Sequence, residues 1–370
     1  MSLCISPNLK NLPVYQPGRP IEEVARELGL APESIIKLAS NENPLGPSKL
    51  ALRAMRNALK TAHFYPDGNA YYLKQKLAAR LELPTSNLIL GNGSNEVIEF
   101  LGHALLGSDA EVVVSQYCFA VYPIVTALFG AKLVSVPAKD YGHDLKGMLA
   151  AINTNTRLVI VANPNNPTGT TVSRDELAHF VEAVPENVVL ALDEAYFEFL
   201  DEPLDLLPEI RSGRKPNLLL MRTFSKIYGL AGLRLGYGMG HTELIAGLEK
   251  IRQPFNINSI SQAGAIAALD DNSHVQKTRR INSRGLRFFT LEFRKLGLEY
   301  LPSGANFILV RVEDGQRVFN EMQKLGVIVR PMGGYQLPEW VRISVGMPKQ
   351  NDRCIEALKK ALEISRTQRP

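Results

Sequence analysis

The chain has 370 residues, a length that predicts two domains, and its 45% hydrophobic and 21% charged residues are typical of a globular protein. Lys and Arg outnumber Asp and Glu by 42 to 37, which gives a formal net charge of +5 and favours the binding of small anions. The sequence has no dense basic blocks interleaved with aromatics, so this charge does not indicate a nucleic-acid-binding protein. The three scattered cysteines, Cys4, Cys118 and Cys354, disfavour a disulfide framework, and no apolar stretch resembles a membrane span or a signal core, so we expect a cytoplasmic protein.

The first 45 residues are expected to form an N-terminal arm. They are rich in proline, at Pro7, Pro13, Pro17 and Pro20. One short helical pattern covers residues 21–28. After the arm, Ser48 is a candidate N-cap for a helix at residues 49–60.

An alternation of strands and helices follows. Short apolar runs occur at residues 88–90, 112–114, 133–136, 158–161, 188–192 and 218–221. They are too short for buried helices and have the composition of buried parallel strands. Helices are expected between them, and Ser173 with Glu176 forms a capping box ahead of one of them. The pattern predicts an α/β fold with a mostly parallel sheet and helices on both faces, in a large domain at residues 46–265.

A smaller α/β domain is expected at residues 266–370. Leu286, Phe289, Phe293 and Leu296 recur at steps of three and four and give one apolar helix face. Strand-like runs then occur at residues 307–312, 327–329 and 341–345, and a helical pattern at residues 354–364 ends the domain.

Polar groups follow four of the six predicted strands of the large domain, at the edge where ligands bind in such sheets. The first group, Gly91-Asn92-Gly93-Ser94-Asn95-Glu96, opens an apolar helix. Glycines and a helix N-terminus suit a phosphate, although a structural turn uses the same residues. The second, at residues 163–169, contains Asn166 and is also typical of a rigid turn.

The other two groups carry an acid and a lysine. Asp193-Glu194-Ala195-Tyr196 follows the strand at residues 188–192. A buried carboxylate needs a partner, although Asp193 could equally cap a helix. Arg222-Thr223-Phe224-Ser225-Lys226 follows the next strand, with Gly229, Gly232 and Arg234 beyond it. Taken singly, Lys226 could face solvent.

In combination, these groups resemble fold-type-I pyridoxal 5'-phosphate (PLP) aminotransferases. The elements containing Asn166, Asp193 and Lys226 occur in the order of that family, with spacings of 193 − 166 = 27 and 226 − 193 = 33. Three further segments resemble the histidinol-phosphate aminotransferase branch. They are Ser40-Asn41-Glu42-Asn43-Pro44, Tyr65-Pro66-Asp67-Gly68 and Arg342-Ile343-Ser344-Val345-Gly346.

The resemblance implies a role for each cofactor residue. Lys226 would hold PLP covalently and act as the base of the 1,3-proton shift. Asp193 would pair with the pyridine nitrogen, while Tyr196 and Asn166 would hydrogen-bond the phenolate oxygen. The ring face would lie against Phe119, or in its place Tyr117 or Tyr122. The phosphate would bind Ser94, Asn95, Thr223, Ser225 and Arg234. Family members commonly have Asp in place of Asn95, which leaves only a backbone role secure there.

The resemblance also implies a homodimer in which Tyr65 reaches the partner's cofactor phosphate and the arm contributes to the small domain and the dimer. The reaction would move an amino group between L-histidinol phosphate and 2-oxoglutarate, giving imidazole-acetol phosphate and L-glutamate. The substrate would bind Tyr15, Asn166, Arg330 and Arg342.

Other functions compete with this interpretation. An aromatic amino acid aminotransferase or a threonine-phosphate decarboxylase shares the same cofactor residues. Glycines at residues 91–93 and 236–240 would be compatible with a nucleotide-binding dehydrogenase, but the acidic residue expected about twenty residues after such a glycine motif is missing. A non-catalytic relative would lack the lysine. The six histidines show no metal-ligand spacing, so no metal is expected.

Overall fold

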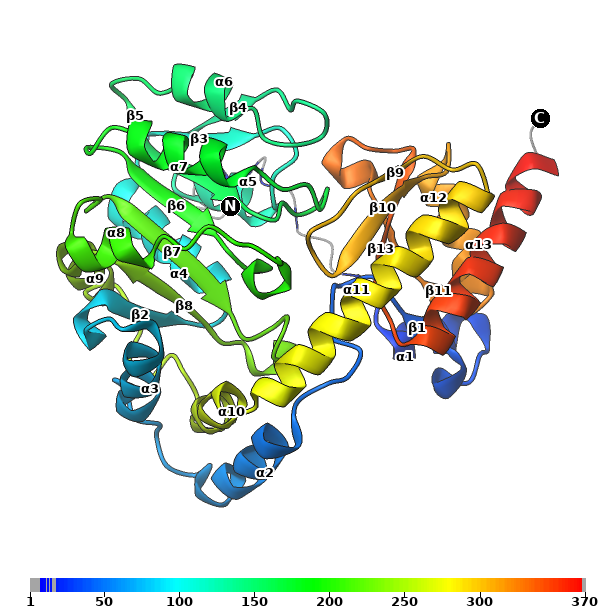
Figure 1. Ribbon diagram of the computed structural model, residues 1–370, viewed down its shortest axis with the longest axis horizontal. Coiled ribbons are helices and arrows are strands. Elements are labelled where there is room, and N and C mark those ends of the chain that lie inside the picture. The colour runs from blue at the N-terminus through cyan, green and yellow to red at the C-terminus, as the bar shows by residue number, and fades with distance from the viewer. Residues whose placement is uncertain (1–6, 11, 13, 15–17, 368–370) are drawn as a thin grey trace, which may run out of the picture.

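The computed structural model describes residues 7–10, 12, 14 and 18–367. These residues form two bodies, each with its own sheet, joined by a long helix and by the N-terminal arm (Figure 1). Tyr15, predicted to bind the substrate, lies outside the described residues, as does Cys4. Among the described helices, none combines the length and apolar character that a membrane span requires.

A seven-stranded sheet forms the large body, with strand order β2-β8-β7-β6-β5-β3-β4. The strands are β2 (Leu88–Gly91), β3 (Glu111–Ser115), β4 (Lys132–Val136), β5 (Thr156–Ala162), β6 (Val189–Asp193), β7 (Leu218–Thr223) and β8 (Gly236–Gly240). All neighbours pair in parallel except β8, which is antiparallel to both β2 and β7. The mostly parallel sheet predicted from the sequence is therefore confirmed.

Within the seven-stranded sheet, β8 is the strand that the sequence analysis did not predict. Its alternating glycines lower strand propensity, so the segment does not look like a strand in one dimension. In three dimensions a Cβ at Gly238 would lie 3.0 Å from Ile89 Cγ2 and 3.2 Å from Val97 Cγ1. The glycines thus let a helix pack closely on the sheet, and their place in an antiparallel strand removes the basis for a dinucleotide-binding loop there.

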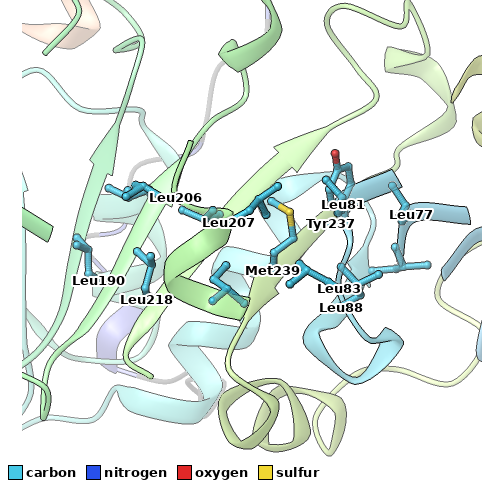
Figure 2. Close-up of a cluster of buried hydrophobic side chains, with 14 of the residues drawn as sticks. Leu77, Leu81, Leu83, Leu88, Leu190, Leu206, Leu207, Leu218, Tyr237 and Met239 are labelled. Carbon is cyan, nitrogen blue, oxygen red and sulfur yellow. The ribbon is translucent and has the colours of Figure 1, made fainter. Parts of the chain in front are cut away.

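Helices cover both faces of this sheet. One face holds α2 (Lys49–Ala58), α3 (Tyr71–Leu81), α6 (Leu145–Ala150), α7 (Arg174–Ala183), α8 (Leu207–Ser212) and α10 (Ser259–Leu269). The other holds α4 (Ser94–Leu105), α5 (Val121–Leu128) and α9 (Thr242–Glu249). Successive strand residues alternate between the two cores. Leu190 packs in the first core (Figure 2), and Ala191 packs in the second. By this alternation Asp193 points to the same side as α5.

Local capping explains where two helices begin. The Ser48 side chain accepts a hydrogen bond from Ala51 N at 3.2 Å, and Ser173 Oγ accepts one from Glu176 N at 3.3 Å. Both serines satisfy N–H groups that have no partner within the helix. Helix α2 ends at Ala58 and continues as a 3-10 turn, η3 (Leu59–Thr61), so the predicted helix 49–60 is tightened at its end.

The small body is an antiparallel sheet covered by three helices. Its strand order is β12-β13-β10-β9, from β9 (Tyr300–Leu301), β10 (Phe307–Arg311), β12 (Arg330–Pro331) and β13 (Trp340–Ser344). The helices are α11 (Asn272–Lys295), α12 (Gly315–Lys324) and α13 (Pro348–Thr367). Phe289 and Phe293 are fully buried on α11, as their spacing predicts. Shorter 3-10 helices are η1 (Pro7–Leu9), η2 (Pro32–Ser34), η4 (Thr85–Asn87), η5 (Phe197–Phe199), η6 (Ala231–Leu233) and η7 (Gly333–Tyr335).

The arm packs into the small body. Helix α1 (Ile21–Leu28) contributes Val24 to its core, and β1 (Ile36–Lys37) pairs in parallel with β11 (Val327–Ile328). At the other end, α10 runs past the predicted boundary at residue 265, and Leu269 still packs in the large core. We therefore propose a boundary between the two bodies near residue 270, a few residues beyond the predicted one, since a sequence cannot show which core a helix end joins.

Candidate active site

A cavity of about 270 Å³ lies at the carboxyl ends of the central strands, between the two bodies. This is the edge at which open α/β sheets bind ligands. Its lining from the large body includes Gly93, Ser94, Asn95, Phe119, Asn166, Asp193, Tyr196, Thr223, Ser225, Lys226 and Arg234. From the arm and the small body it includes Gly18, Ala39, Ser40, Asn41, Glu42, Arg330, Tyr335 and Arg342. Of the predicted site residues that are described, only Tyr65 lies elsewhere.

One end of the cavity is suited to a phosphate. The N-terminus of α4 opens into it, and the first N–H groups of a helix have no intrahelical acceptor. Gly93 caps this helix with φ +76°, and a Cβ there would lie 2.6 Å from Arg234 Nη2. A side chain at residue 93 would therefore displace the guanidinium.

Hydroxyl groups complete this anionic end. Thr223 Oγ1 donates to Ser225 Oγ at 3.0 Å, and Arg234 Nη1 lies 3.5 Å from the same oxygen. Backbone N–H groups, two hydroxyls and a guanidinium are the donor set of a phosphate site. The side chain of Asn95 is exposed, so its backbone is the part suited to this role.

Asp193 ends β6 as a buried carboxylate held by two donors. Tyr122 donates its hydroxyl proton to Oδ2 at 2.7 Å, and Ala195 N donates to Oδ1 at 3.1 Å. Burial raises the pKa of Asp193, while these hydrogen bonds and the charge of Lys226 act to lower it. A buried carboxylate in this setting suits a cationic ring nitrogen.

Of the three aromatic candidates for ring stacking, Phe119 lines the cavity. Tyr122 is fully buried behind it, with the two rings edge to face at 5.8 Å between centroids. Tyr117 stacks instead on Tyr141, at 6.0 Å. Tyr122 is thus a residue whose role the sequence analysis missed, because only the fold brings α5 against the end of β6.

Lys226 follows β7 and points into the cavity, where its Nζ donates to Ser40 O at 3.3 Å. The pKa of this amine is lowered to about 8, first by burial and then by the positive charges of Arg342 and Arg234, against the opposing effects of Glu42 and Asp193. At this pKa a substantial fraction is neutral near physiological pH. A neutral amine is both a nucleophile and a base.

Two arginines of the small body line the cavity. Arg330 in β12 is the direct partner of Arg342 in β13, so their side chains project on the same face. Arg342 Nη2 donates to Ala39 O at 3.0 Å, and Nη1 donates to Asn166 Oδ1. Like charges directly opposite each other repel, and an anion bound between the two guanidinium groups would offset that repulsion.

Comparison with known proteins identifies the family. The family model for aminotransferases of class I and II matches residues 33–358. The chain belongs to this family. Among curated relatives, the histidinol-phosphate aminotransferase of Akkermansia muciniphila is 51% identical over 352 residues, covering 95% of this chain and 96% of the relative. Histidinol-phosphate aminotransferase 1 of Nitrosococcus oceani is 48% identical over 356 residues, covering 96% of each.

Solved structures agree with the sequence relatives of this aminotransferase. The histidinol-phosphate aminotransferase of Sinorhizobium meliloti, solved in complex with pyridoxal 5'-phosphate, matches with a TM-score of 0.90 and 31% identity. The match covers 99% of both chains. The fold class expected from the sequence is therefore confirmed over the whole described chain.

The aminotransferase site also contains arm residues to which the sequence analysis assigned no role. Ser40, Asn41 and Glu42 were recognised as part of a family segment, and all three line the cavity. Asn41 is in the left-handed region at φ +56° and donates its amide proton to Tyr196 Oη at 2.9 Å. Asparagine tolerates this backbone region better than most residues. The residue type at position 41 was therefore the one sequence feature that could have indicated an unusual backbone conformation there.

Proposed function

We propose that this aminotransferase uses PLP to transfer the amino group between L-histidinol phosphate and 2-oxoglutarate, forming imidazole-acetol phosphate and L-glutamate. The observation that carries the proposal is the opposed pair Arg330 and Arg342, which the small body contributes to the cavity lining. The names of the relatives at 51% and 48% identity support the same substrate.

The residues present fit PLP at both of its polar ends. When bound, the cofactor supplies an electron sink for the substrate carbon. Its phosphate would be held by the N-terminus of α4, the hydroxyls of Thr223 and Ser225, and Arg234. The narrow space over Gly93 supports this, because only a residue without a side chain leaves Arg234 in place.

The chain's own groups would hold or move the protons around the cofactor. Asp193 would hold a proton on the pyridine nitrogen through charge-assisted hydrogen bonding. Tyr196 and Asn166 would donate hydrogen bonds to the ring oxygen. Lys226, once its amine is released from the cofactor, would move the proton between the two carbons of the substrate–cofactor pair, for which a pKa of about 8 is suitable.

The substrate phosphate would lie between Arg330 and Arg342. A phosphate dianion gains from two guanidinium groups, whereas an amino acid carboxylate needs only one. Tyr15 remains a prediction from the sequence as a further donor. Closure of the small body over the substrate would exclude water from the site. A cytoplasmic location likewise stays a prediction.

Single-turnover measurements with histidinol phosphate, phenylalanine and threonine phosphate test the proposal. We expect histidinol phosphate to react fastest. Arg330→Ala and Arg342→Ala should each raise its KM by roughly tenfold to a hundredfold, since a charged hydrogen bond contributes about 1.5–3 kcal/mol. Phenylalanine should depend on Arg342 and little on Arg330. If the wild type prefers phenylalanine and Arg330→Ala leaves that rate unchanged, the protein is an aromatic amino acid aminotransferase.

We also propose a homodimer with shared active sites. Tyr65 is 83% exposed and stacks on Phe255, itself 46% exposed, with ring centroids 4.9 Å apart. Phe64, Tyr71 and Tyr72 are exposed on the adjoining segments. Large exposed aromatics gathered in one region support an interface with a second copy. Tyr65 would then reach the partner's cofactor phosphate.

Mixing two inactive variants tests the shared site. In a heterodimer of Lys226→Ala and Tyr65→Ala chains, shared sites give one site with both changes and one with neither. Activity should therefore reappear above that of either parent dimer. No gain in a purified heterodimer would show that Tyr65 acts within its own chain or not at all.

A further inference from the structure

Asn41 joins three parts of the molecule through its hydrogen bonds. It belongs to the arm and is only 1% exposed. Its backbone N donates to Ser344 Oγ at 2.8 Å, and its backbone O accepts from Asn306 Nδ2 at 2.9 Å, both from the small body. Its side chain contacts Ser344 on one side and Tyr196 of the large body on the other. Every polar group of Asn41 is therefore in use.

The Asn41 amide lies between Ser344 and Tyr196. Ser344 Oγ accepts the backbone N–H of Asn41 at 2.8 Å and donates its own proton to Asn41 Oδ1 at 3.0 Å. The amide oxygen is thus directed to Ser344 and the amide nitrogen to Tyr196. An amide nitrogen can only donate, so the Tyr196 oxygen is the acceptor in this bond.

The consequence concerns the proton of Tyr196. Because its oxygen accepts from Asn41, the hydroxyl must direct its own proton elsewhere, and Tyr196 lines the cavity. Burial, the largest effect, raises the pKa of Tyr196 to about 12, so the hydroxyl keeps its proton in the working range. The charged or titratable groups near it are Arg342, Asp193, Tyr335 and Lys226.

We propose that Asn41 is a positioning residue that makes Tyr196 a one-way hydrogen-bond donor to the ring oxygen of the cofactor, and that Ser344 makes this orientation depend on the small body. The proposal rests on the proposed function, since the receiving oxygen belongs to PLP. It adds a residue of the arm to the control of the cofactor's electronic state.

The variant Asn41→Asp reverses the polarity of the contact. A carboxylate has the same shape, tolerates the left-handed backbone and accepts hydrogen bonds only. It would take the Tyr196 proton away from the cavity. Asn41→Gly removes the side chain and suits the same backbone conformation, so it keeps the proposal testable if the aspartate variant does not fold.

The measurement is the pH midpoint of the visible absorbance of the bound cofactor. A donor at the ring oxygen stabilises its negative charge, so losing that donor favours protonation of the nitrogen that joins Lys226 to the ring. Asn41→Asp should raise the midpoint by roughly one to two units, the equivalent of one charged hydrogen bond. Asn41→Gly should raise it by less, because the hydroxyl is then free to rotate.

Two further variants separate the proposed effect from simpler ones. Tyr196→Phe should raise the midpoint as Asn41→Asp does, and the double variant should show no additional shift. Asn217→Asp is the matched control, since Asn217 is a buried asparagine whose amide binds the backbone oxygens of Pro185 and Val188. It should leave the midpoint unchanged.

The possible outcomes distinguish this proposal from the function beneath it. A wild type that binds no PLP would overturn the proposed function. If the wild type binds PLP and the Asn41→Asp and Asn41→Gly variants have the same pH midpoint as the wild type, the role of Asn41 is overturned and the proposed function is not. A shift in Asn41→Asp that persists in the Tyr196→Phe background would also overturn the role of Asn41, because the new charge would then act without Tyr196.

Discussion

Replacing Tyr122 with phenylalanine removes a single hydroxyl from behind the active site. The phenylalanine ring still fills the space in the core and still meets Phe119 edge to face. What is lost is the hydrogen bond to Asp193 Oδ2, at 2.7 Å. The carboxylate keeps only the donor from Ala195 N, at 3.1 Å.

The magnitude follows from the burial of Asp193, which is 5% exposed. Burial already raises the pKa of this carboxyl, and Tyr122 provides the first of the effects that oppose it. Removing that donor raises the pKa further, so the carboxyl is more easily protonated and pairs less well with a cationic ring nitrogen. One hydrogen bond to a charged group contributes about 1.5–3 kcal/mol. Because the bond is present with and without PLP, this energy is the upper limit of the effect, which corresponds to a rise of at most roughly a hundredfold in the dissociation constant of PLP.

Fluorescence titration of apoenzyme with PLP measures this constant directly. The loss of affinity should be larger at low pH, because the raised pKa of Asp193 is then crossed sooner. Tyr237→Phe is the matched control, since Tyr237 is also buried but packs in the core on the opposite face of the sheet. In an Asp193→Asn background the effect of Tyr122→Phe should largely disappear. Equal affinity of Tyr122→Phe and wild type across the pH range would refute the reasoning.

Four further outcomes are expected. Borohydride should attach the pyridoxyl group to the peptide containing Lys226, and label on another lysine would contradict the site. The rate at which apoenzyme captures PLP should rise with pH around 8, the pKa of Lys226, and Arg342→Ala should move this midpoint upward because it removes a cation that lowers that pKa. Asp193→Asn should lower kcat through the loss of about 2–4 kcal/mol of transition-state stabilisation. This loss should exceed the loss in PLP binding free energy. Ser48→Ala should lower the free energy of unfolding by about 0.5–2 kcal/mol through loss of the α2 N-cap, measured by urea denaturation.

The strands of the large body were recognisable because each is a short, continuous apolar run. Such runs mark strands buried on both faces, and the residues that follow them must lie at the ligand-binding edge. Asp193 and Lys226 were predicted to lie at that edge in this way, and both line the cavity there, whereas the roles predicted for them came from the family resemblance. The caps at Ser48 and Ser173 were also local, since each involves residues three positions apart.

Contacts between distant segments had to come from the fold. Tyr122 lies 71 residues from Asp193, and Asn41 lies 155 residues from Tyr196. Neither pairing leaves a periodic pattern, because hydrogen bonds between side chains depend on where two elements meet and not on their spacing.

The same reason explains the remaining differences between sequence and structure. The glycines of β8 resembled a loop until α4 was seen to require their missing side chains. Arg330 and Arg342 were separate strand residues until the antiparallel register placed them opposite each other. The sequence by itself determined which chemical groups stand at the ends of the strands. Only the packing of the arm, the large body and the small body around one cavity decided how the side chains of those groups are oriented. Side-chain orientation depends on contacts between distant segments, which the linear order of residues does not contain.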